Sequence, residues 1–329
     1  MADRRHFIRS LAAMTAGMMF SEANEKEYAG QQQDRIGELL PLRTLGKTGE
    51  KVTMLGVGGG HVEHAGRKKA PEIIETAMAG GIRFFDNAQL YGPNEGEKLF
   101  GEFLCPQYRD VIFLMTKTYA KDAKTARTHL EGSLRRMKTD YVDLWQIHSV
   151  GSVEDVDQRI EEGVLDVVLE AKKSGKARYV GFTGHTSYQA HLRMLERTDQ
   201  LDTCQMPINI FDPNYKSFIT NVLPRLKESN LGVIAMKALA NGGFFGGEKS
   251  FLHGDNPKIV PKVASIKEAL HFVWSLPVSV LVTGAESGPM LQEKIDLAKS
   301  FTDLDESTRL ALVERVANFD GSKVEYYKA

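Results

Sequence analysis

The sequence predicts a (β/α)8 TIM barrel, an α/β fold, with an N-terminal hairpin at the barrel floor and extra C-terminal helices. Short apolar runs of strand character recur about every 32 residues, which is the length of one βα unit. Amphipathic helical segments separate the runs, and eight such units close a barrel. The runs begin near Met54, Ile82, Val111, Tyr141, Arg178, Thr203, Gly232 and Val278.

Several of the strand-like runs are continuous rather than alternating, as in residues 111–115 and 278–282. This is typical of parallel strands that are covered on both faces. The segments between the strands carry apolar residues at helical spacing, and we interpret them as core stripes. One stripe consists of Ala126, Leu130, Leu134 and Met137, and another of Ile160, Val164, Val168 and Ala171.

Further segments complete the expected barrel. Residues 45–52 have the pattern of a hairpin that covers the barrel floor. Residues 240–262 lie in the longest interval between strands and are rich in Gly, Phe and Lys, which predicts a lid at one barrel mouth. Residues 290–300 and 307–319 predict closing helices after the last strand.

The N-terminal residues have the order of a bacterial export signal. Arg4 and Arg5 form a twin-arginine pair ahead of a mildly apolar stretch over residues 11–20, and small residues precede Asn24. The apolar stretch is too short to span a bilayer permanently. We therefore expect an exported, periplasmic protein that meets the twin-arginine export machinery. The alternative is a cytoplasmic protein with a basic amphipathic N-terminal helix.

The chain divides accordingly into three parts. They are a twin-arginine signal peptide over residues 1–23, a polar connector over residues 24–41 that we expect to be weakly structured from residue 24 to 38, and the barrel over residues 42–329.

Composition excludes several classes of protein. Lys and Arg (42) nearly balance Asp and Glu (43), and no long basic stripe is present, so the sequence does not predict a nucleic-acid partner. Two cysteines are too few for a disulfide framework, a structural zinc site or an iron–sulfur cluster. We expect stability to come from packing and the partner to be a small molecule.

Reactive residues of a βα barrel lie at the C-terminal ends of its strands. Three successive apolar runs end in an acid, an ammonium group and an imidazole, which are Asp86, Lys117 and His148. Tyr91 follows Asp86 by five residues, in a loop with Gly92 that can fold the phenol over the same opening. Each residue taken singly is more often structural, but their joint placement predicts one shared site.

Together these groups suit proton transfer to an alkoxide. A phenol has a pKa of about 10 and needs neighbouring positive charge to act as an acid near neutral pH, which Lys117 supplies. Asp86 can pair with Lys117, and His148 can donate a hydrogen bond to a bound carbonyl. The set lacks a nucleophile and a metal cage. Carbonyl reduction would then need a hydride from a nicotinamide or flavin cofactor.

Four segments resemble signature segments of the aldo-keto reductase superfamily. They are FDNAQLYG (residues 85–92), MTK (115–117), DYVDLWQIH (140–148) and RTLGKTGEKVTMLGVGGG (43–60). The likeness runs from about residue 42 to about residue 297. It implies a catalytic tetrad of Asp86, Tyr91, Lys117 and His148, with Tyr91 as general acid. It also implies NAD(P)H-dependent reduction of an aldehyde or ketone, or the reverse oxidation.

The resemblance implies an extended NADP(H) across the barrel mouth, and no G-x-G-x-x-G stands in the sequence. Thr183 stands where the family places a serine that holds the nicotinamide carboxamide, and Gly184 replaces the asparagine that follows. Gln205 matches the family's amide ligand. Met236 takes the place of an aromatic residue that often stacks on the nicotinamide, and Lys237 could approach the pyrophosphate.

The adenine end is less typical of an NADP(H) site. After Gly284 the stretch contains Glu286, which would repel a 2′-phosphate and could accept from a ribose hydroxyl, and only Lys294 is basic. We therefore take NADP(H) as the cofactor that the family implies and NAD(H) as a real alternative.

Other readings stay open. The run His61–Val62–Glu63–His64 has metal-ligand residue types, but we interpret it as a substrate-side loop and predict no metal site. His185 either lines the cleft or caps the following helix. A second function is also possible for a barrel of this kind, namely a nicotinamide-binding regulatory or scaffold protein with little turnover.

Overall fold

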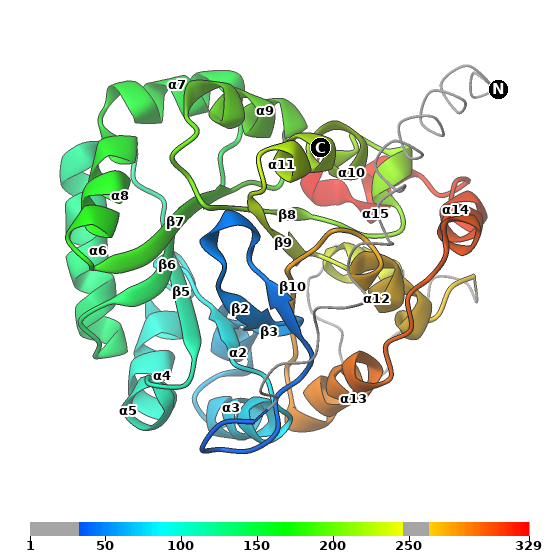
Figure 1. Ribbon diagram of the computed structural model, residues 1–329, viewed down its shortest axis with the longest axis horizontal. Helices are drawn as coiled ribbons and strands as arrows, with labels where there is room; N and C mark the ends of the chain where they lie inside the picture. Colours follow the sequence, from blue (N-terminus) through cyan, green and yellow to red (C-terminus); the bar gives the residue numbers. More distant parts are fainter. Residues whose placement is uncertain (1–32, 246–262, 329) are drawn as a thin grey trace.

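The computed structural model describes residues 33–245 and 263–328, and it confirms the predicted barrel. Eight parallel strands form a closed ring in which β10 pairs with both β9 and β3. Figure 1 shows this ring with helices around its outside. The barrel strands are β3 (Leu55–Gly58), β4 (Phe84–Asp86), β5 (Phe113–Thr118), β6 (Val142–Ile147), β7 (Ala177–Thr183), β8 (Thr203–Pro207), β9 (Gly232–Met236) and β10 (Val280–Thr283).

Helices cover the outside of the ring. Their first half comprises α2 (Gly59–Ala65), α3 (Ala70–Ala79), α4 (Glu95–Phe103), α5 (Cys105–Tyr108), α6 (Ala123–Met137), α7 (Val153–Glu161) and α8 (Val164–Lys173). Their second half comprises α9 (Tyr188–Arg197), α10 (Phe218–Asn221), α11 (Leu223–Glu228), α12 (Ile266–Trp274), α13 (Gly288–Lys299), α14 (Glu306–Arg315) and α15 (Gly321–Val324). Short 3-10 turns are η2 (Gly46–Thr48), η3 (Asp212–Asn214), η4 (Ala240–Phe245) and η6 (Tyr326–Lys328).

Helix α6 illustrates why these segments are helical. Asp122 caps its N-terminus by accepting from the backbone N–H of Thr125, and Arg135 and Arg136 lie in its last turn. Its predicted stripe is buried against the barrel. The second predicted stripe is interrupted, because Gly163 adopts a left-handed φ of 77° that ends α7 and starts α8. Residues 160–171 therefore belong to two helices rather than one.

The predicted floor hairpin is present. Strand β1 (Leu42–Thr44) pairs antiparallel with β2 (Lys51–Thr53), and the blue hairpin lies at the centre of the ring in Figure 1. Leu45 and Val52 insert into the barrel interior, where they join an apolar cluster with aromatic side chains such as Phe84. The hairpin thus closes the end of the barrel opposite the C-terminal ends of the strands.

The described part of the connector differs from the weakly structured segment expected over residues 24–38. Asp34 accepts two hydrogen bonds from the guanidinium of Arg83, at 2.6 and 2.9 Å, and Leu40 is part of the main core. Arg83 also donates to the backbone carbonyls of Met78 in α3 and of Ile82, so this ion pair joins the connector to the fold. The described part of the connector, from residue 33, is therefore packed.

The predicted loop at residues 61–64 is part of α2, because the glycines that precede it accommodate the start of a helix directly after β3. The closing helices are α13 and α14. Only the beginning of the predicted lid, η4, lies among the described residues, and the signal peptide lies wholly outside them. None of the described helices has both the length and the apolar character that crossing a membrane requires.

Candidate active site

The ends of three adjacent strands bring the predicted acid, ammonium and imidazole together. Asp86 is the last residue of β4, Lys117 lies near the end of β5, and His148 directly follows β6. Strand register places Asp86 opposite Met115 and Lys117 opposite Gln146. All three predicted side chains are buried. Because parallel strands end at the same mouth, these groups lie together at one end of the barrel.

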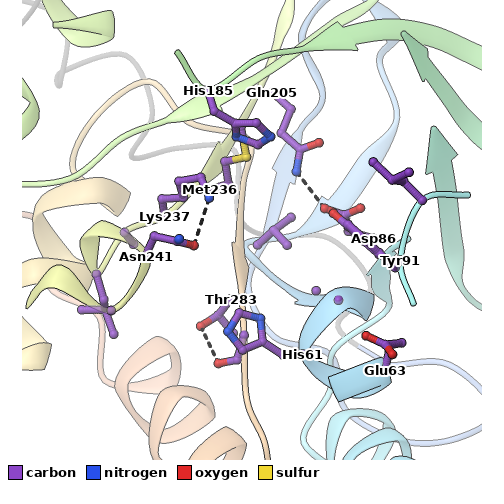
Figure 2. Close-up of a pocket in the computed structure, with 18 of the residues that line it drawn as sticks. His61, Glu63, Asp86, Tyr91, His185, Gln205, Met236, Lys237, Asn241 and Thr283 are labelled. Atoms are coloured by element: carbon purple, nitrogen blue, oxygen red, sulfur yellow. Dashed lines mark hydrogen bonds between the residues drawn. The ribbon is translucent and has the colours of Figure 1, made fainter. Parts of the chain in front are cut away.

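Lys117 is the centre of the hydrogen-bond network. Its ammonium group donates to a carboxylate oxygen of Asp86, to the backbone carbonyl of Asn87 at 2.8 Å and to the phenol oxygen of Tyr91 at 3.3 Å. Gln205 Nε2 donates to the other oxygen of Asp86 at 2.8 Å, as Figure 2 shows. The three donors of the ammonium are thereby all used, which fixes its position.

Burial and charge shift the pKa values of this network in ways that keep its protons in place. Burial raises the pKa of Tyr91, and the ammonium of Lys117 offsets this only in part. The expected lowering of the phenol pKa by Lys117 is thus outweighed by loss of solvent. For Lys117, burial lowers the pKa, but Asp86 and Tyr91 more than offset it, so the pKa lies above its usual value. The phenol is protonated and the amine charged at neutral pH.

His148 is a neutral imidazole in this site. Burial, followed by the positive charges of Lys117 and Arg159, holds its pKa well below the usual value. The ring of His148 meets the rings of Tyr91 and Tyr119 edge-on, each at 6.1 Å between centroids. Arg159 Nη1 donates to the His148 carbonyl at 2.9 Å and so holds its backbone. A neutral imidazole can donate one hydrogen bond.

Asp86, Tyr91, His148 and Gln205 line a pocket of about 430 Å³, a size that suits a small ligand, and Lys117 lies behind this lining, bonded to Asp86 and Tyr91. Figure 2 shows its labelled side chains around the barrel mouth. Its lining is Gly58, Gly60, His61, Glu63, Asp86, Leu90, Tyr91, Gly92, His148, His185, Gln205, Met236, Lys237, Ala238, Leu239, Asn241, Gly242, Val282, Thr283 and Gly284.

Among the predicted cofactor residues, Gln205, Met236, Lys237 and Gly284 line this pocket. Thr183 is fully buried and lies opposite Gln205 in the β7–β8 pair. Thr183 Oγ1 and Gln205 Oε1 are buried and have no hydrogen-bond partner among the described residues. A buried polar atom without a partner is costly. A carboxamide, which offers both donors and an acceptor, fits such a pair.

The remaining predicted cofactor residues lie outside the pocket lining. A side chain at Gly184 would meet His191 and the Val150 carbonyl, each at 2.6 Å, so this position faces the protein. Lys294 is buried on α13 and donates to the Gly284 carbonyl, and burial lowers its pKa to about 8. Glu286 lies just before α13, and its negative charge raises the pKa of Lys294 and so partly offsets the effect of burial.

Some lining residues lay outside the predicted cofactor set. His61 and Glu63 reach the pocket from α2. His185, which follows β7, lines the pocket. It does not cap the next helix, because Ser187 caps the N-terminus of α9. Asn241 lies in η4 and bonds to the C-terminal residues, a long-range contact that no local sequence pattern signals. The described part of the chain holds no group of acids, histidines and cysteines that could bind a metal ion.

The barrel, its tyrosine–lysine–carboxylate–imidazole site and the matching family model define the chain as an oxidoreductase of the α/β-barrel class. More narrowly, the chain belongs to the Aldo/keto reductase family, whose family model matches residues 54–305.

Relatives agree with this placement. The chain is 31% identical to the oxidoreductase YrpG of Bacillus subtilis over 230 residues, which cover 62% of this chain and 68% of that protein. It is 28% identical to L-galactose dehydrogenase of Arabidopsis thaliana over 221 residues, which cover 62% of this chain and 66% of that protein.

Solved structures share the fold. An aldo-keto reductase from Bacillus halodurans in its holo form superposes with a TM-score of 0.71 at 22% identity, covering 88% of this chain and all of that one. An aldo-keto reductase from Klebsiella pneumoniae in complex with NADPH gives a TM-score of 0.63 at 18% identity, covering 85% of this chain and 96% of that one.

Proposed function

We propose that this protein reduces the carbonyl of an aldehyde or ketone with NAD(P)H, or oxidises the corresponding alcohol, with Tyr91 as general acid or base. The observation that supports this most is the approach of the phenol of Tyr91, which lines the pocket, to the Lys117 ammonium at 3.3 Å. When bound, the nicotinamide supplies or accepts the hydride.

The proposed roles follow from the protonation states. Neutral His148 donates a hydrogen bond to the carbonyl oxygen and orients it. Tyr91, kept protonated by burial, gives its proton to that oxygen as negative charge develops. Lys117, held by Asp86, stabilises the phenolate that remains.

We propose NADP(H) as the cofactor, with NAD(H) as the alternative. The buried Thr183 and Gln205 oxygens suit the nicotinamide carboxamide, and the Klebsiella pneumoniae relative of the same fold is in complex with NADPH. Lys237 is the cationic side chain in the pocket lining that is suited to the diphosphate.

The proposal of export by the twin-arginine route rests on residues 4–20, and sequencing the N-terminus of the protein from fractionated cells tests it.

Consumption of NADPH at 340 nm with a panel of aromatic and sugar aldehydes tests the reductase proposal. We expect turnover by the natural protein and a loss of about a hundredfold or more in kcat for Tyr91→Phe, because the acid is removed. NADPH binding, followed by fluorescence, should be retained in the variant. Tyr108→Phe is the matched control, since the Tyr108 hydroxyl bonds to Glu75 on the outside of the barrel.

Full activity in Tyr91→Phe would refute the acid assignment. Tight NADPH binding by the natural protein without turnover on any aldehyde would favour the regulatory or scaffold function instead.

A further inference from the structure

Glu63 is a carboxylate of the pocket lining that the proposed reaction does not use. The acids among the described lining residues are Asp86 and Glu63. Asp86 bonds to Lys117 and to Gln205, so both of its oxygens have partners. The side chain of Glu63, in contrast, makes no hydrogen bond or ion pair with any residue that the structure describes. Its oxygens are therefore available to a ligand.

Helix α2 places this carboxylate beside Tyr91. Gly60 and Glu63 are three residues apart on α2, so they share one face of the helix. A side chain at Gly60 would lie 3.6 Å from the Tyr91 ring, which shows how closely this face approaches the phenol. A side chain at Gly92 would come within 2.1 Å of Glu63 Oε1. The carboxylate thus lies over the backbone of the residue that follows Tyr91.

Two glycines leave the room that the Glu63 side chain occupies. Gly92 has a left-handed φ of 52°, and a side chain there would meet the Cγ atom of Glu63 at 2.6 Å. A side chain at Gly96 would lie 3.6 Å from the Cβ atom of Glu63. Figure 2 shows Glu63 near Tyr91, on the side of the pocket away from Lys237.

The substrate has to approach Tyr91 on the side of the pocket where Glu63 lies. Gln205, Met236 and Lys237, which suit the cofactor, come from the ends of β8 and β9. Tyr91 follows β4, which pairs with β3, and α2 begins directly after β3. A carbonyl oxygen that accepts the proton of Tyr91 therefore brings the rest of its molecule close to Glu63.

The chemistry of a carboxylate decides which substrates benefit from this approach. An ionised carboxylate accepts hydrogen bonds and donates none, so it favours hydroxyl and ammonium groups. It repels a second carboxylate or a phosphate, and the repulsion is stronger in a partly enclosed pocket than in water. Glu63 is half-buried, so both effects are larger here than on an open surface.

We propose that Glu63 is a specificity-determining residue that selects carbonyl substrates bearing a hydrogen-bond donor, either a hydroxyl or an ammonium group, and disfavours those bearing a carboxylate or phosphate. The inference rests on the proposed reductase function, because it concerns the carbonyl substrate of that reaction.

Steady-state kinetics of the full-length protein with NADPH test the selection. The substrates are benzaldehydes that carry a methyl, hydroxymethyl, dimethylaminomethyl or carboxyl group, each in its meta and para forms. The variants are Glu63→Gln, which removes the charge, and Glu63→Asp, which keeps it. Glu95→Gln is the matched control, because Glu95 is also an acid near Tyr91 in sequence but bonds to Lys98 outside the pocket lining.

The measured quantity is kcat/KM for each polar aldehyde divided by kcat/KM for the methyl compound with the same protein. For Glu63→Gln we expect this ratio to fall about tenfold for the ammonium compound and about threefold for the hydroxymethyl compound, and to rise about tenfold for the carboxylate. A fall for the ammonium compound alone would identify a cation as the selected group. Glu63→Asp should retain the discrimination against the carboxylate.

Three results would count against the proposal, and they can be told apart. Ratios that stay constant in Glu63→Gln, or shift equally in Glu95→Gln, overturn the selection by Glu63. A higher Kd for NADPH in Glu63→Gln with constant ratios overturns it as well, because the carboxylate would then face the cofactor. Absence of NADPH oxidation by the natural protein with every one of the aldehydes would refute the reductase function itself.

Discussion

A single lysine organises the residues of the site. Lys117 bonds to a carboxylate, a carbonyl and a phenol that come from β4 and the loop after it, so its three donors fix the direction of the ammonium. Asp86 keeps the Lys117 ammonium charged although burial favours the neutral amine. Burial keeps the Tyr91 phenol protonated although the positive charge of Lys117 favours the phenolate. Opposing effects of solvent loss and pairing thus set the protonation state of each residue.

The proposed cofactor preference also rests on single residues. The buried ammonium of Lys294 already donates to the Gly284 carbonyl, which leaves it poorly placed for a 2′-phosphate, and Glu286 would repel that group. We expect Glu286→Arg to raise the affinity for NADPH relative to NADH by about tenfold, because a guanidinium can bind a phosphate with charge-assisted hydrogen bonds. Titration of both cofactors measures the ratio.

Glu293→Arg provides the control for Glu286→Arg. Glu293 is exposed on α13, so this variant makes the same change of charge further along the helix. If the ratio of the two affinities stays constant in Glu286→Arg, or shifts equally in both variants, Glu286 does not contact the adenosine end of the cofactor.

The positions of the four central groups could be predicted from the sequence because strand ends in a barrel share one mouth. The locations of three apolar runs were enough to predict that Asp86, Lys117 and His148 lie together. Asn241 and Tyr326 could not be found in this way, since their contact joins residues 85 positions apart. Gly184 and Lys294 were assigned by position in the family, which does not reveal which way a side chain faces.

Among the elements, the floor hairpin depends on glycine at Gly46. Its φ is 52°, and a side chain there would lie 2.3 Å from the backbone nitrogen of Gly232. We expect Gly46→Ala to lower the free energy of unfolding by about 3 kcal/mol or more, because the left-handed strain is joined by a clash that pushes Leu45 out of the barrel interior. Urea unfolding followed by circular dichroism measures the change.

Gly49 is the matched control within the same hairpin. Its φ is 71°, but a side chain there would meet nothing within 4 Å. Gly49→Ala should therefore cost only about 1–2 kcal/mol, the cost of the left-handed conformation alone. Equal losses in the two variants would show that the hairpin can move away from the barrel without penalty.

Strands were predicted more reliably than helices because continuous apolar runs have few alternative explanations in an α/β sequence. The division between α7 and α8 depends on the left-handed Gly163, and helical periodicity continues through it. Helix α2 was expected as a loop because glycines precede it, yet the end of β3 directs the chain into a helical turn.

At the scale of the whole molecule, the two ends of the described chain both return to the barrel. Asp34 bonds to Arg83 near the start of β4, and Lys328 is buried between Asp212 and Glu325 beside the mouth. Neither pairing could be predicted, because charged residues near chain ends usually remain in solvent. The barrel was predictable from the repeat of its βα units. The two ion pairs at the chain ends form only after distant parts of the sequence come together in the folded protein.

Buried histidines give the whole molecule a predictable response to acid. Burial holds the pKa values of His148 and His185 well below their usual value and lowers that of His191 to about 4. The unfolded chain takes up protons on these residues below about pH 6.5, while the folded chain does not, so their contribution is complete above that pH and is lost as the pH falls. Glu325 acts in the opposite direction, because burial raises its pKa.

We therefore expect stability to fall between pH 6.5 and 5, by about 1.4 kcal/mol per pH unit for each fully buried neutral histidine. Thermal and urea unfolding at half-unit steps of pH measure the slope. His191→Phe replaces a ring packed between Phe182 and Phe218. It should make the slope of unfolding free energy against pH shallower by the contribution of about one proton, which is about 1.4 kcal/mol per pH unit. His64→Gln changes an exposed histidine of α2 and should leave it unaltered. A flat profile over this range, or equal slopes in both variants, would mean that the buried imidazoles become charged without unfolding.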